Sequence, residues 1–199
     1  MARRKEQSAE TEQALKDAAR RLFAERGYLN TKITDITAAA GRSAGSFYNH
    51  FAGKEELLQA LLRDFGEAGD IAADAAEHSP DFTDPAAVRY HVRNYWQFAR
   101  AHWPVLRAVG QAALVNDEFA HVAARFAAEE RAELADHLDG FDAAGLTLPS
   151  TPDASLAMAF LMVQALLEAV EEGALALTDA QAIDGLTRFI YRGLTGRDY

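Results

Sequence analysis

The stretch Ala40–Phe51 reads AGRSAGSFYNHF, is followed shortly by Gly53-Lys54-Glu55, and decides the fold of the first part of this chain. Gly41 suits a turn position with positive φ, which a residue without Cβ adopts readily. Ser43 suits the N-cap of a following helix. Residues 33–40 carry apolar side chains at helical spacing, which predicts a short helix before the turn. Two short helices joined by a glycine turn are typical of a helix-turn-helix, which places its second helix in the major groove of DNA.

A wider segment, Ala18–Leu62, resembles the DNA-binding domain of the TetR family, the tetracycline-repressor-like transcriptional regulators. The segment lies within about the first third of the chain, and the remainder resembles the family only in length and helical character. The resemblance implies an all-α regulator of about nine helices. The positions that carry it are Leu22-Phe23, Gly27-Tyr28, Asp35-Ile36, Ala40-Gly41, Ser43, Phe47-Tyr48, His50-Phe51 and Lys54-Glu55.

The charge of the chain is divided unevenly. The formal net charge is −10, which by itself does not favour a DNA-binding protein. Residues 1–63, however, hold 11 Lys and Arg against 8 Asp and Glu, whereas residues 64–199 hold 9 against 22. The basic share therefore lies with the predicted DNA-binding helices, as phosphate binding requires.

Composition excludes several classes of protein. The sequence contains no cysteine, so disulfide frameworks and thiolate metal sites are excluded. The N-terminus is basic but has no apolar segment behind it, unlike a signal peptide. No apolar run approaches the roughly 20 residues that cross a bilayer. We therefore expect a cytoplasmic protein with no membrane partner.

Helical periodicity extends through the whole chain, and no alternating strand pattern of useful length is present. We expect an N-terminal helix-turn-helix DNA-binding domain over residues 1–53 and a helical ligand-sensing and dimerisation domain over residues 54–199. Proline and glycine mark the loops between helices. Besides the helix-turn-helix, we expect a helix over about residues 8–26 and a helix that starts at Lys54. Further helices are expected from Pro85 towards His102, through Leu106–Leu114, and over residues 117–138, 153–172 and 179–193.

A recognition helix needs side chains that grip phosphates and side chains that read base edges. By the resemblance, Tyr48 and Lys54 match phosphate-binding positions and His50 matches a frequent third. Thr31 and Lys32, at the entry to the second helix, are candidates for a further phosphate contact. The residues predicted to read bases are Arg42, Ser43, Ala44, Gly45 and Ser46.

Arg42 departs from the family pattern, in which a small aliphatic residue, often valine, usually occupies this position. A long cation here either reaches a phosphate or forms a bidentate pair with a guanine, worth roughly 1–3 kcal/mol of discrimination. The sequence does not choose between the two. Lys32 is a lesser departure, since a hydroxyl or small residue often follows Thr31. Both changes add positive charge on the DNA side.

The resemblance also implies a homodimer that reads a palindromic double-stranded DNA operator, because two recognition helices roughly 34–36 Å apart contact two half-sites. The segment around residues 153–172 is apolar on more than one face, so it must be buried on several sides. A purely internal core helix is the alternative. The predicted dimer interface comprises Leu156, Phe160, Val163, Leu167, Ile183, Leu186, Phe189 and Ile190.

A ligand cavity in the C-terminal helices is a further implication of the resemblance, and the segment Asn94–Gln111 is weakly similar in spacing to the branch with the ethionamide-resistance repressor. A mainly apolar lining with few polar groups favours an apolar or amphipathic small-molecule effector. Aromatic side chains at helical spacing are also typical of a plain core. The candidate lining residues are Asn94, Trp96, Trp103, Gln111, Phe126, Phe160 and Gln164.

Two other classes of function are less well supported. Glu129, Glu130, Glu133 and His137 share part of one predicted helix face, but a metal site needs ligands that converge from several elements. No nucleophile elbow, phosphate loop or zinc-protease motif is present. We therefore expect no enzyme, no cofactor and no metal site. A protein-interaction module that does not use its helix-turn-helix is a second alternative, against which Tyr48, Lys54 and the uneven charge argue.

Overall fold

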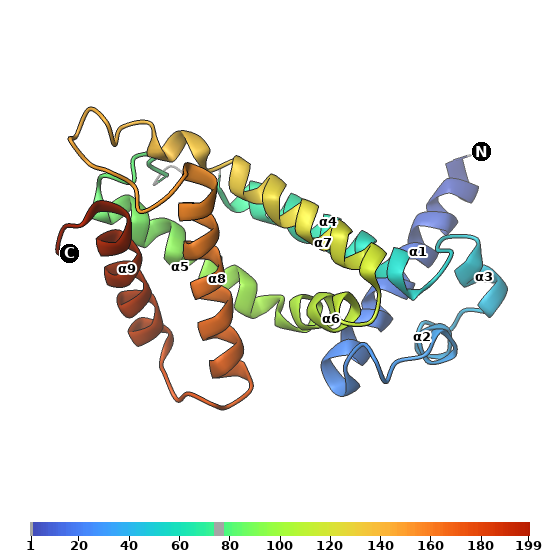
Figure 1. The fold of residues 1–199 in the computed structure, drawn as a ribbon. Helices are drawn as coiled ribbons and strands as arrows, with labels where there is room; N and C mark the ends of the chain where they lie inside the picture. The colour runs from blue at the N-terminus through green and yellow to red at the C-terminus, as the bar shows by residue number, and fades with distance from the viewer. Residues whose placement is uncertain (1, 74–77) are drawn as a thin grey trace. The chain divides into compact units, whose positions relative to one another are not determined.

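A computed structural model describes the backbone of residues 2–73 and 78–199, and the side chains of residues 5–66 and 78–199. These residues form α-helices, a short 3₁₀ helix and connecting loops, so the predicted all-α class with about nine helices is confirmed for the described part of the chain (Figure 1). The helices are α1 (Ala2–Arg26), α2 (Ile33–Ala39), α3 (Ala44–Tyr48), α4 (Lys54–Ala73), α5 (Pro85–Ala101), α6 (Trp103–Ala113), α7 (Asp117–Ala132), the 3₁₀ helix η1 (Ala135–Leu138), α8 (Pro152–Glu171) and α9 (Asp179–Thr195).

The chain divides into two compact units. The N-terminal unit comprises Met1–Ala68 together with His102–Ala124, and the C-terminal unit comprises Gly69–Ala101 together with Arg125–Tyr199. The compact units therefore do not divide at residue 53, because α6 returns to the N-terminal unit. The functional division into DNA-binding and sensing parts stays a prediction.

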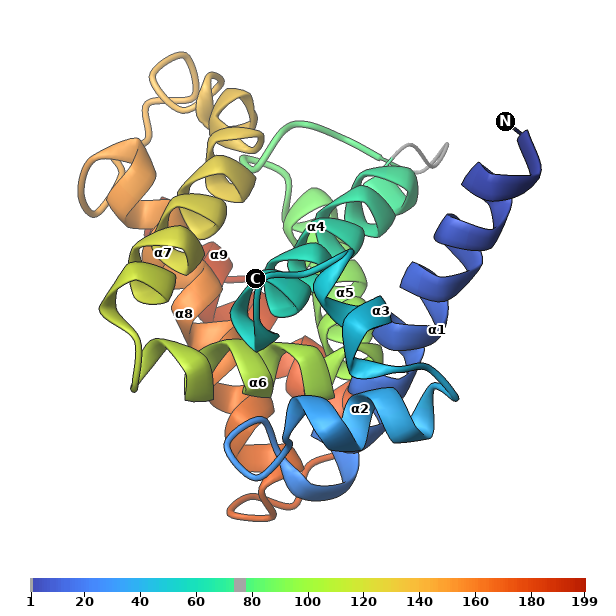
Figure 2. The same cartoon turned by 90° about the vertical axis from the view of Figure 1, so that its right-hand side faces the viewer.

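The core of the N-terminal unit is built on α1, against which α2, α3 and α6 all pack (Figure 2). Apolar side chains recur at helical spacing along one face of α1 and are buried, as the sequence predicts. Asp64 of α4 reinforces this arrangement by accepting hydrogen bonds from Lys16 at 2.9 Å and Arg20 at 2.6 Å. The buried core includes Leu15, Leu22, Phe23, Ile36, Phe47, Phe51, Leu57, Leu58, Leu61, Val105, Ala108, Ala112 and Phe119.

In the C-terminal unit, α5 packs against α8 and α9, and α8 packs against α9 (Figure 1). Trp96 of α5 is fully buried, and its indole N–H donates a 2.8 Å hydrogen bond to Asp179 at the start of α9. Arg100 extends this connection by pairing with Asp179 and, at 2.8 Å, with Glu171 of α8. One end of α5 is therefore tied to both of the last two helices.

Several predicted boundaries differ from the observed ones. α1 begins at Ala2 rather than near Ser8, because the polar start of the chain continues the helix. The predicted helix over 117–138 ends at Ala132 and is followed by the separate turn η1. The predicted starts at Lys54, Pro85 and Asp179 are confirmed.

α8 corrects the expectation that no apolar segment reaches membrane-spanning length. It has 20 residues and a window of mean hydropathy 1.5, which is long and apolar enough to cross a bilayer by length and composition alone. Only 22% of that window is buried within the chain. A helix that packs on a core with one face and on a partner with another has the same composition, so this property alone does not indicate a membrane protein.

Candidate nucleic-acid interface

The turn between α2 and α3 has the geometry that its glycine predicts. Gly41 has φ +63°, and its amide donates to the Ala38 carbonyl, while the Arg42 amide donates to the Thr37 carbonyl at 2.9 Å. This pair of bonds is the Schellman arrangement that ends a helix on a left-handed residue. No atom lies within 4 Å of a Cβ built on Gly41, so the backbone conformation rather than space requires glycine here.

The start of α3 is capped by Ser43, as predicted: its hydroxyl accepts a 3.1 Å hydrogen bond from the Ser46 amide. Phe47 and Phe51 are buried and their rings lie 5.7 Å apart, which anchors the helix to the core of the N-terminal unit. With these two side chains turned inward, the opposite face of α3 is left to solvent.

That outer face carries most of the residues predicted to contact DNA. Lys32, Arg42, Ser43, Ala44 and Gly45 are exposed, and Ser46 is half-buried. Tyr48 is 58% exposed, and its ring stands edge-on to Phe47. The nearest atom to a Cβ built on Gly45 is the Ser43 hydroxyl oxygen at 3.9 Å, so the surface of α3 is open at this glycine. The start and outer face of α3 thus present one cation, a phenol and small residues to solvent, and a second exposed cation, Lys32, caps the start of α2.

Thr31 and His50 lie differently from the expectation. Thr31 is buried, and its hydroxyl donates a 2.7 Å hydrogen bond to the Gly27 carbonyl, so the predicted phosphate contact through this hydroxyl is not supported. This hydrogen bond instead stabilises the turn that follows α1. The His50 side chain is only 12% exposed, and its Nδ1 lies 3.6 Å from the Glu12 carboxylate. Its contact with DNA stays a prediction.

Lys54 has partners within the protein. Its ammonium donates hydrogen bonds to the carbonyls of Tyr28 at 2.7 Å and Thr31 at 2.9 Å, and lies 3.9 Å from the centre of the Tyr28 ring. Burial lowers the pKa of Lys54, although the neighbouring Glu55 opposes this shift. Two of its three donors therefore hold the turn that leads into α2, and at most one is left for a phosphate.

Tyr28 connects this turn to α4 and α6. Its hydroxyl donates to Glu55 at 2.9 Å, and burial together with this carboxylate raises the pKa of the phenol. Its backbone amide donates to the side-chain oxygen of Gln111 at 2.8 Å. Sequence analysis missed this role of Gln111, because nothing in the local pattern of α6 records a partner 83 positions earlier in the chain.

The residues predicted to line a ligand cavity are not all in one unit. Gln111 and Trp103 belong to the N-terminal unit, and Gln111 is occupied by Tyr28, which contradicts its assignment to a cavity of the C-terminal helices. Trp96 is a buried core residue tied to Asp179. Asn94 and Phe126 are half-buried.

Phe160 and Gln164 are brought together with Tyr95 in the C-terminal unit. The Phe160 ring stands edge-on to Tyr95 at 4.9 Å, and Gln164 donates a 3.0 Å hydrogen bond to the Tyr95 hydroxyl. A separate open hollow of about 350 Å³ is lined by none of the predicted residues. Its lining is Pro85, Ala86, Arg89, Tyr90, Arg93 and Tyr199.

The predicted dimer residues require a correction. Six of the eight are buried within the single chain, because α5 covers the inner faces of α8 and α9; these are Leu156, Val163, Leu167, Ile183, Leu186 and Ile190. They form an intramolecular core and are not available to a partner. Phe160 is half-buried and Phe189 is 68% exposed. The exposed apolar side chains of this region also include Met158 and Leu161.

Comparisons with known proteins agree with this geometry. A sequence profile described as "Bacterial regulatory proteins, tetR family" matches residues 15–61, which span the helix-turn-helix. The chain is 43% identical over 83 residues to the HTH-type transcriptional regulator TtgR of Pseudomonas putida, covering 42% of this chain and 39% of that protein. It is 49% identical over 51 residues to the repressor KstR2 of Mycobacterium tuberculosis, covering 26% of each. The alignments thus span well under half the length of these relatives.

Solved structures show that the whole fold is similar. A TetR-family regulator from Rhodococcus sp. has a TM-score of 0.75 at 19% identity, over 91% of this chain and 97% of that one. FadR of Bacillus halodurans, a fatty acid degradation regulator, has a TM-score of 0.74 at 19% identity, over 95% and 97%. The matched profile and the relatives are transcriptional regulators, in agreement with the expectation that the chain is not an enzyme. The helix-turn-helix segment of the chain, residues 15–61, therefore resembles that of the tetR family of bacterial regulatory proteins, and the fold of the whole chain is similar to that of solved TetR-family regulators.

Proposed function

We propose that this protein is a transcriptional repressor in the cytoplasm that binds a palindromic DNA operator as a homodimer and is released by a mainly hydrophobic small molecule. The observation that carries the proposal is the exposed face of α3, held by buried Phe47 and Phe51 and capped by Ser43. A rigid short helix with an open surface of small and polar residues fits a major groove, which admits an α-helix closely.

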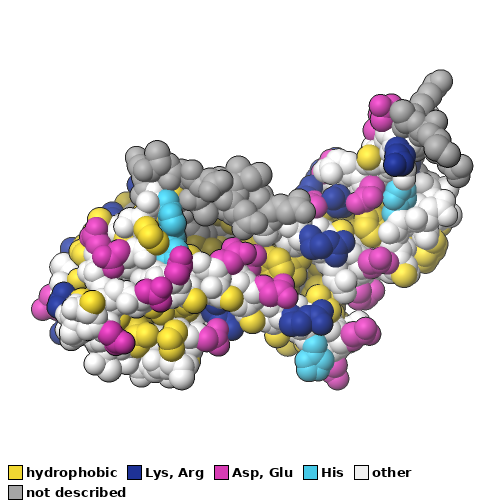
Figure 3. Space-filling model, turned by 90° about the horizontal axis from the view of Figure 1, so that it is seen from above, with side chains coloured by type: hydrophobic (Ala, Val, Ile, Leu, Met, Phe, Trp, Pro, Cys, Tyr) yellow, Lys and Arg dark blue, Asp and Glu magenta, His cyan; other side chains and the backbone are white. Residues whose placement is uncertain are grey.

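The phosphate contacts are assigned to Lys32, Arg42 and Tyr48, whose side chains are exposed beside α3. Lys54 is a positioning residue in this proposal, since its ammonium holds the turn of Tyr28 and Thr31 in place. Figure 3 shows both acidic and basic side chains on the drawn surface. Phosphate binding is therefore assigned to individual side chains and not to the net charge.

Dimerisation is assigned to the outer faces of α8 and α9. Leu161 on α8 and Phe189 on α9 are 63% and 68% exposed. Gly185 and Gly193 precede and follow Phe189 by four residues, and no atom lies within 4 Å of a Cβ built on either. An apolar side chain between two glycines on one helix row allows a second helix to approach closely. The low burial of α8 within the chain supports the same assignment.

An effector is assigned to the C-terminal unit near Tyr95, Phe160 and Gln164, where two aromatic rings and one amide come together. Such a mixture suits an apolar or amphipathic molecule that is oriented by a single polar contact. The effector acts only if it binds one arrangement of the dimer better than the other. A 100-fold preference for the DNA-free form weakens operator affinity by about 2.7 kcal/mol.

Fluorescence anisotropy with a labelled duplex from the DNA upstream of the gene tests the proposal. Binding should be sequence-dependent and fall steeply with salt. Arg42→Gln and Tyr48→Ala should weaken it, while Arg125→Gln, an exposed arginine on α7, is the matched control and should not. In a dimer, removing Arg42 should reduce the slope of log affinity against log salt by about two if it contacts phosphate. Affinity equal to that for random duplexes, or equal losses in all three variants, would contradict the proposal.

A further inference from the structure

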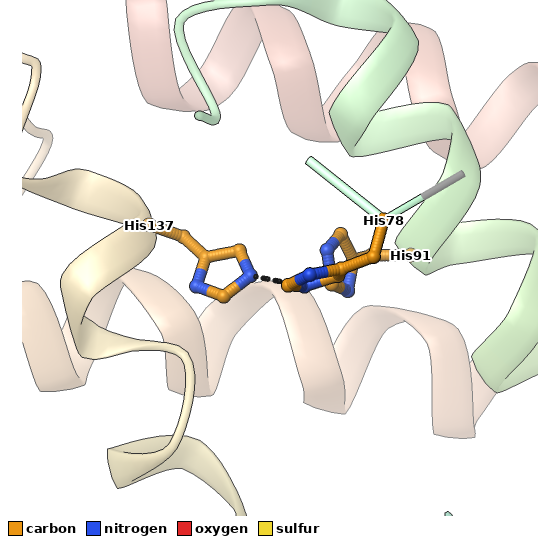
Figure 4. A group of neighbouring side chains, drawn as sticks. All are labelled: His78, His91 and His137. Atoms are coloured by element: carbon orange, nitrogen blue, oxygen red, sulfur yellow. Dashed lines mark hydrogen bonds between the residues drawn. The ribbon is translucent and has the colours of Figure 1, made fainter. Parts of the chain in front are cut away.

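Three histidines from separate segments of the C-terminal unit form a compact group: His78 before α5, His91 on α5 and His137 on η1 (Figure 4). One ring nitrogen of each lies within 4.8 Å of the others. The Nε2 atoms of His78 and His137 are 3.0 Å apart. Two nitrogens on one tetrahedral ion, each at about 2.0–2.1 Å from it, are about 3.3 Å apart. The group therefore needs only small shifts to share one ion.

The outer nitrogens of the two more sheltered histidines are already held by other groups. His137 is buried, and its Nδ1 lies 2.6 Å from the Asp136 carboxylate, which leaves Nε2 facing the other two rings. A carboxylate on the far nitrogen of a histidine orients the ring and raises its basicity, as in many metal sites. The ring of His91 is hydrogen-bonded to the backbone of Ser79.

The inner nitrogen of His91 is an independent indication of a ligand. Its Nε2 is buried and has no hydrogen-bond partner among the described residues. An unpaired buried polar atom costs free energy unless something binds it. The geometry therefore leaves one nitrogen of His91 available to bind an ion beside the other two rings.

We propose that His78, His91 and His137 bind one divalent transition-metal ion of the zinc class. Imidazole ligands suit Zn²⁺, Cu²⁺ and Ni²⁺ rather than Mg²⁺ or Ca²⁺. Three imidazoles leave one position of a tetrahedral ion for water or another exogenous ligand. His78 is exposed, so the group can be reached from solvent. The ion joins the segment before α5, α5 itself and η1, and Asp136 acts as a positioning residue.

This inference goes beyond the proposed function and does not depend on DNA binding. Sequence analysis did not anticipate it, because it considered His137 only together with the acidic residues of its own predicted helix. The spacing of His78, His91 and His137 matches no short motif. Only the fold brings residue 137 beside the start of α5, where the Phe82 amide also donates to the His137 carbonyl at 3.0 Å.

Isothermal titration of Zn²⁺ into the chelator-stripped, tag-free full chain tests the site. We expect one ion per chain with micromolar or tighter affinity, and a thermal unfolding temperature that rises with Zn²⁺. His78→Ala removes an exposed ligand without opening the core, and should weaken binding by at least roughly tenfold and abolish the thermal shift. Asp136→Asn should weaken binding by roughly 10- to 100-fold with unchanged stoichiometry.

His121→Ala is the matched control, since His121 is an exposed histidine on α7 outside the group, and it should bind Zn²⁺ like the wild type. Co²⁺ in place of Zn²⁺ should give the visible absorption of a four-coordinate nitrogen and oxygen site in the wild type but not in His78→Ala. Absence of Zn²⁺ binding to the wild type would overturn the proposal. Unchanged affinity in both His78→Ala and His91→Ala would overturn it equally, by placing the ion elsewhere.

Discussion

The side-chain oxygen of Gln111 on α6 accepts a 2.8 Å hydrogen bond from the backbone amide of Tyr28, at the turn between α1 and α2. The two residues are 83 positions apart in the sequence. The Gln111 side chain also lies against Gly27, where a Cβ would come within 3.1 Å of it. The turn that introduces α2 is therefore supported by a helix from the middle of the chain.

Gln111→Ala should lower the free energy of unfolding by about 1–3 kcal/mol, because the partly buried Tyr28 amide loses its acceptor. Urea unfolding monitored by circular dichroism measures the change. Gln97→Ala, at an exposed position on α5, is the control and should change stability by no more than about 0.5 kcal/mol. Equal effects of the two substitutions would show that the hydrogen bond contributes nothing.

A fragment of residues 1–53 should not fold cooperatively. It contains the whole helix-turn-helix but lacks Leu57, Leu58 and Leu61 of α4 and Val105 of α6, which belong to the same buried core. Without them the apolar face of α1 is left exposed, and short isolated helices are marginal in water. Circular dichroism should show low helicity and no sigmoidal thermal transition, in contrast to the full chain. A sharp transition in the fragment would refute this view of the core.

Phe189→Glu should convert a dimer into a monomer, because it replaces the exposed large apolar side chain of α9 with a charge. Sedimentation velocity measures the molar mass in solution. Leu114→Glu, at an even more exposed apolar residue of the N-terminal unit, is the matched control and should leave the mass unchanged. Dimers that persist in Phe189→Glu would rule out this face as the interface.

Asp179 should contribute a pH-dependent part of the stability. The pKa of its carboxyl is held below its ordinary value by the hydrogen bond from Trp96 and then by Arg100. A carboxyl with a lowered pKa in the folded state stabilises the fold above its unfolded pKa of about 4, and this stabilisation is lost as the pH falls through the lower folded value.

Asp179→Asn should therefore destabilise the protein at pH 7, and the difference from the wild type should shrink as the pH falls below about 4. Urea unfolding at both pH values, followed by tryptophan fluorescence, measures the effect. Asp142→Asn, at an exposed loop position, serves as the control and should have little effect at either pH. A wild-type advantage that does not shrink in acid would mean that the charge of Asp179 contributes nothing.

The local elements around DNA recognition followed from the sequence by itself. The positive φ of Gly41, the N-cap of Ser43 and the helix starts at Lys54 and Pro85 were all predicted. Each depends on interactions within a few residues, such as caps, glycine conformations and helical periodicity, which are legible in one sequence.

Only the tertiary structure decided which apolar residues of the last two helices are buried in the core of the chain and which are exposed. Leu156, Val163 and Ile190 have the composition of an interface, yet α5 covers them, while Phe189 on the same helix pair stays exposed. The tertiary structure likewise decided which groups Lys54, Gln111 and the three histidines contact. Their partners come from distant parts of the chain, and no local pattern records which distant segments the packing brings together.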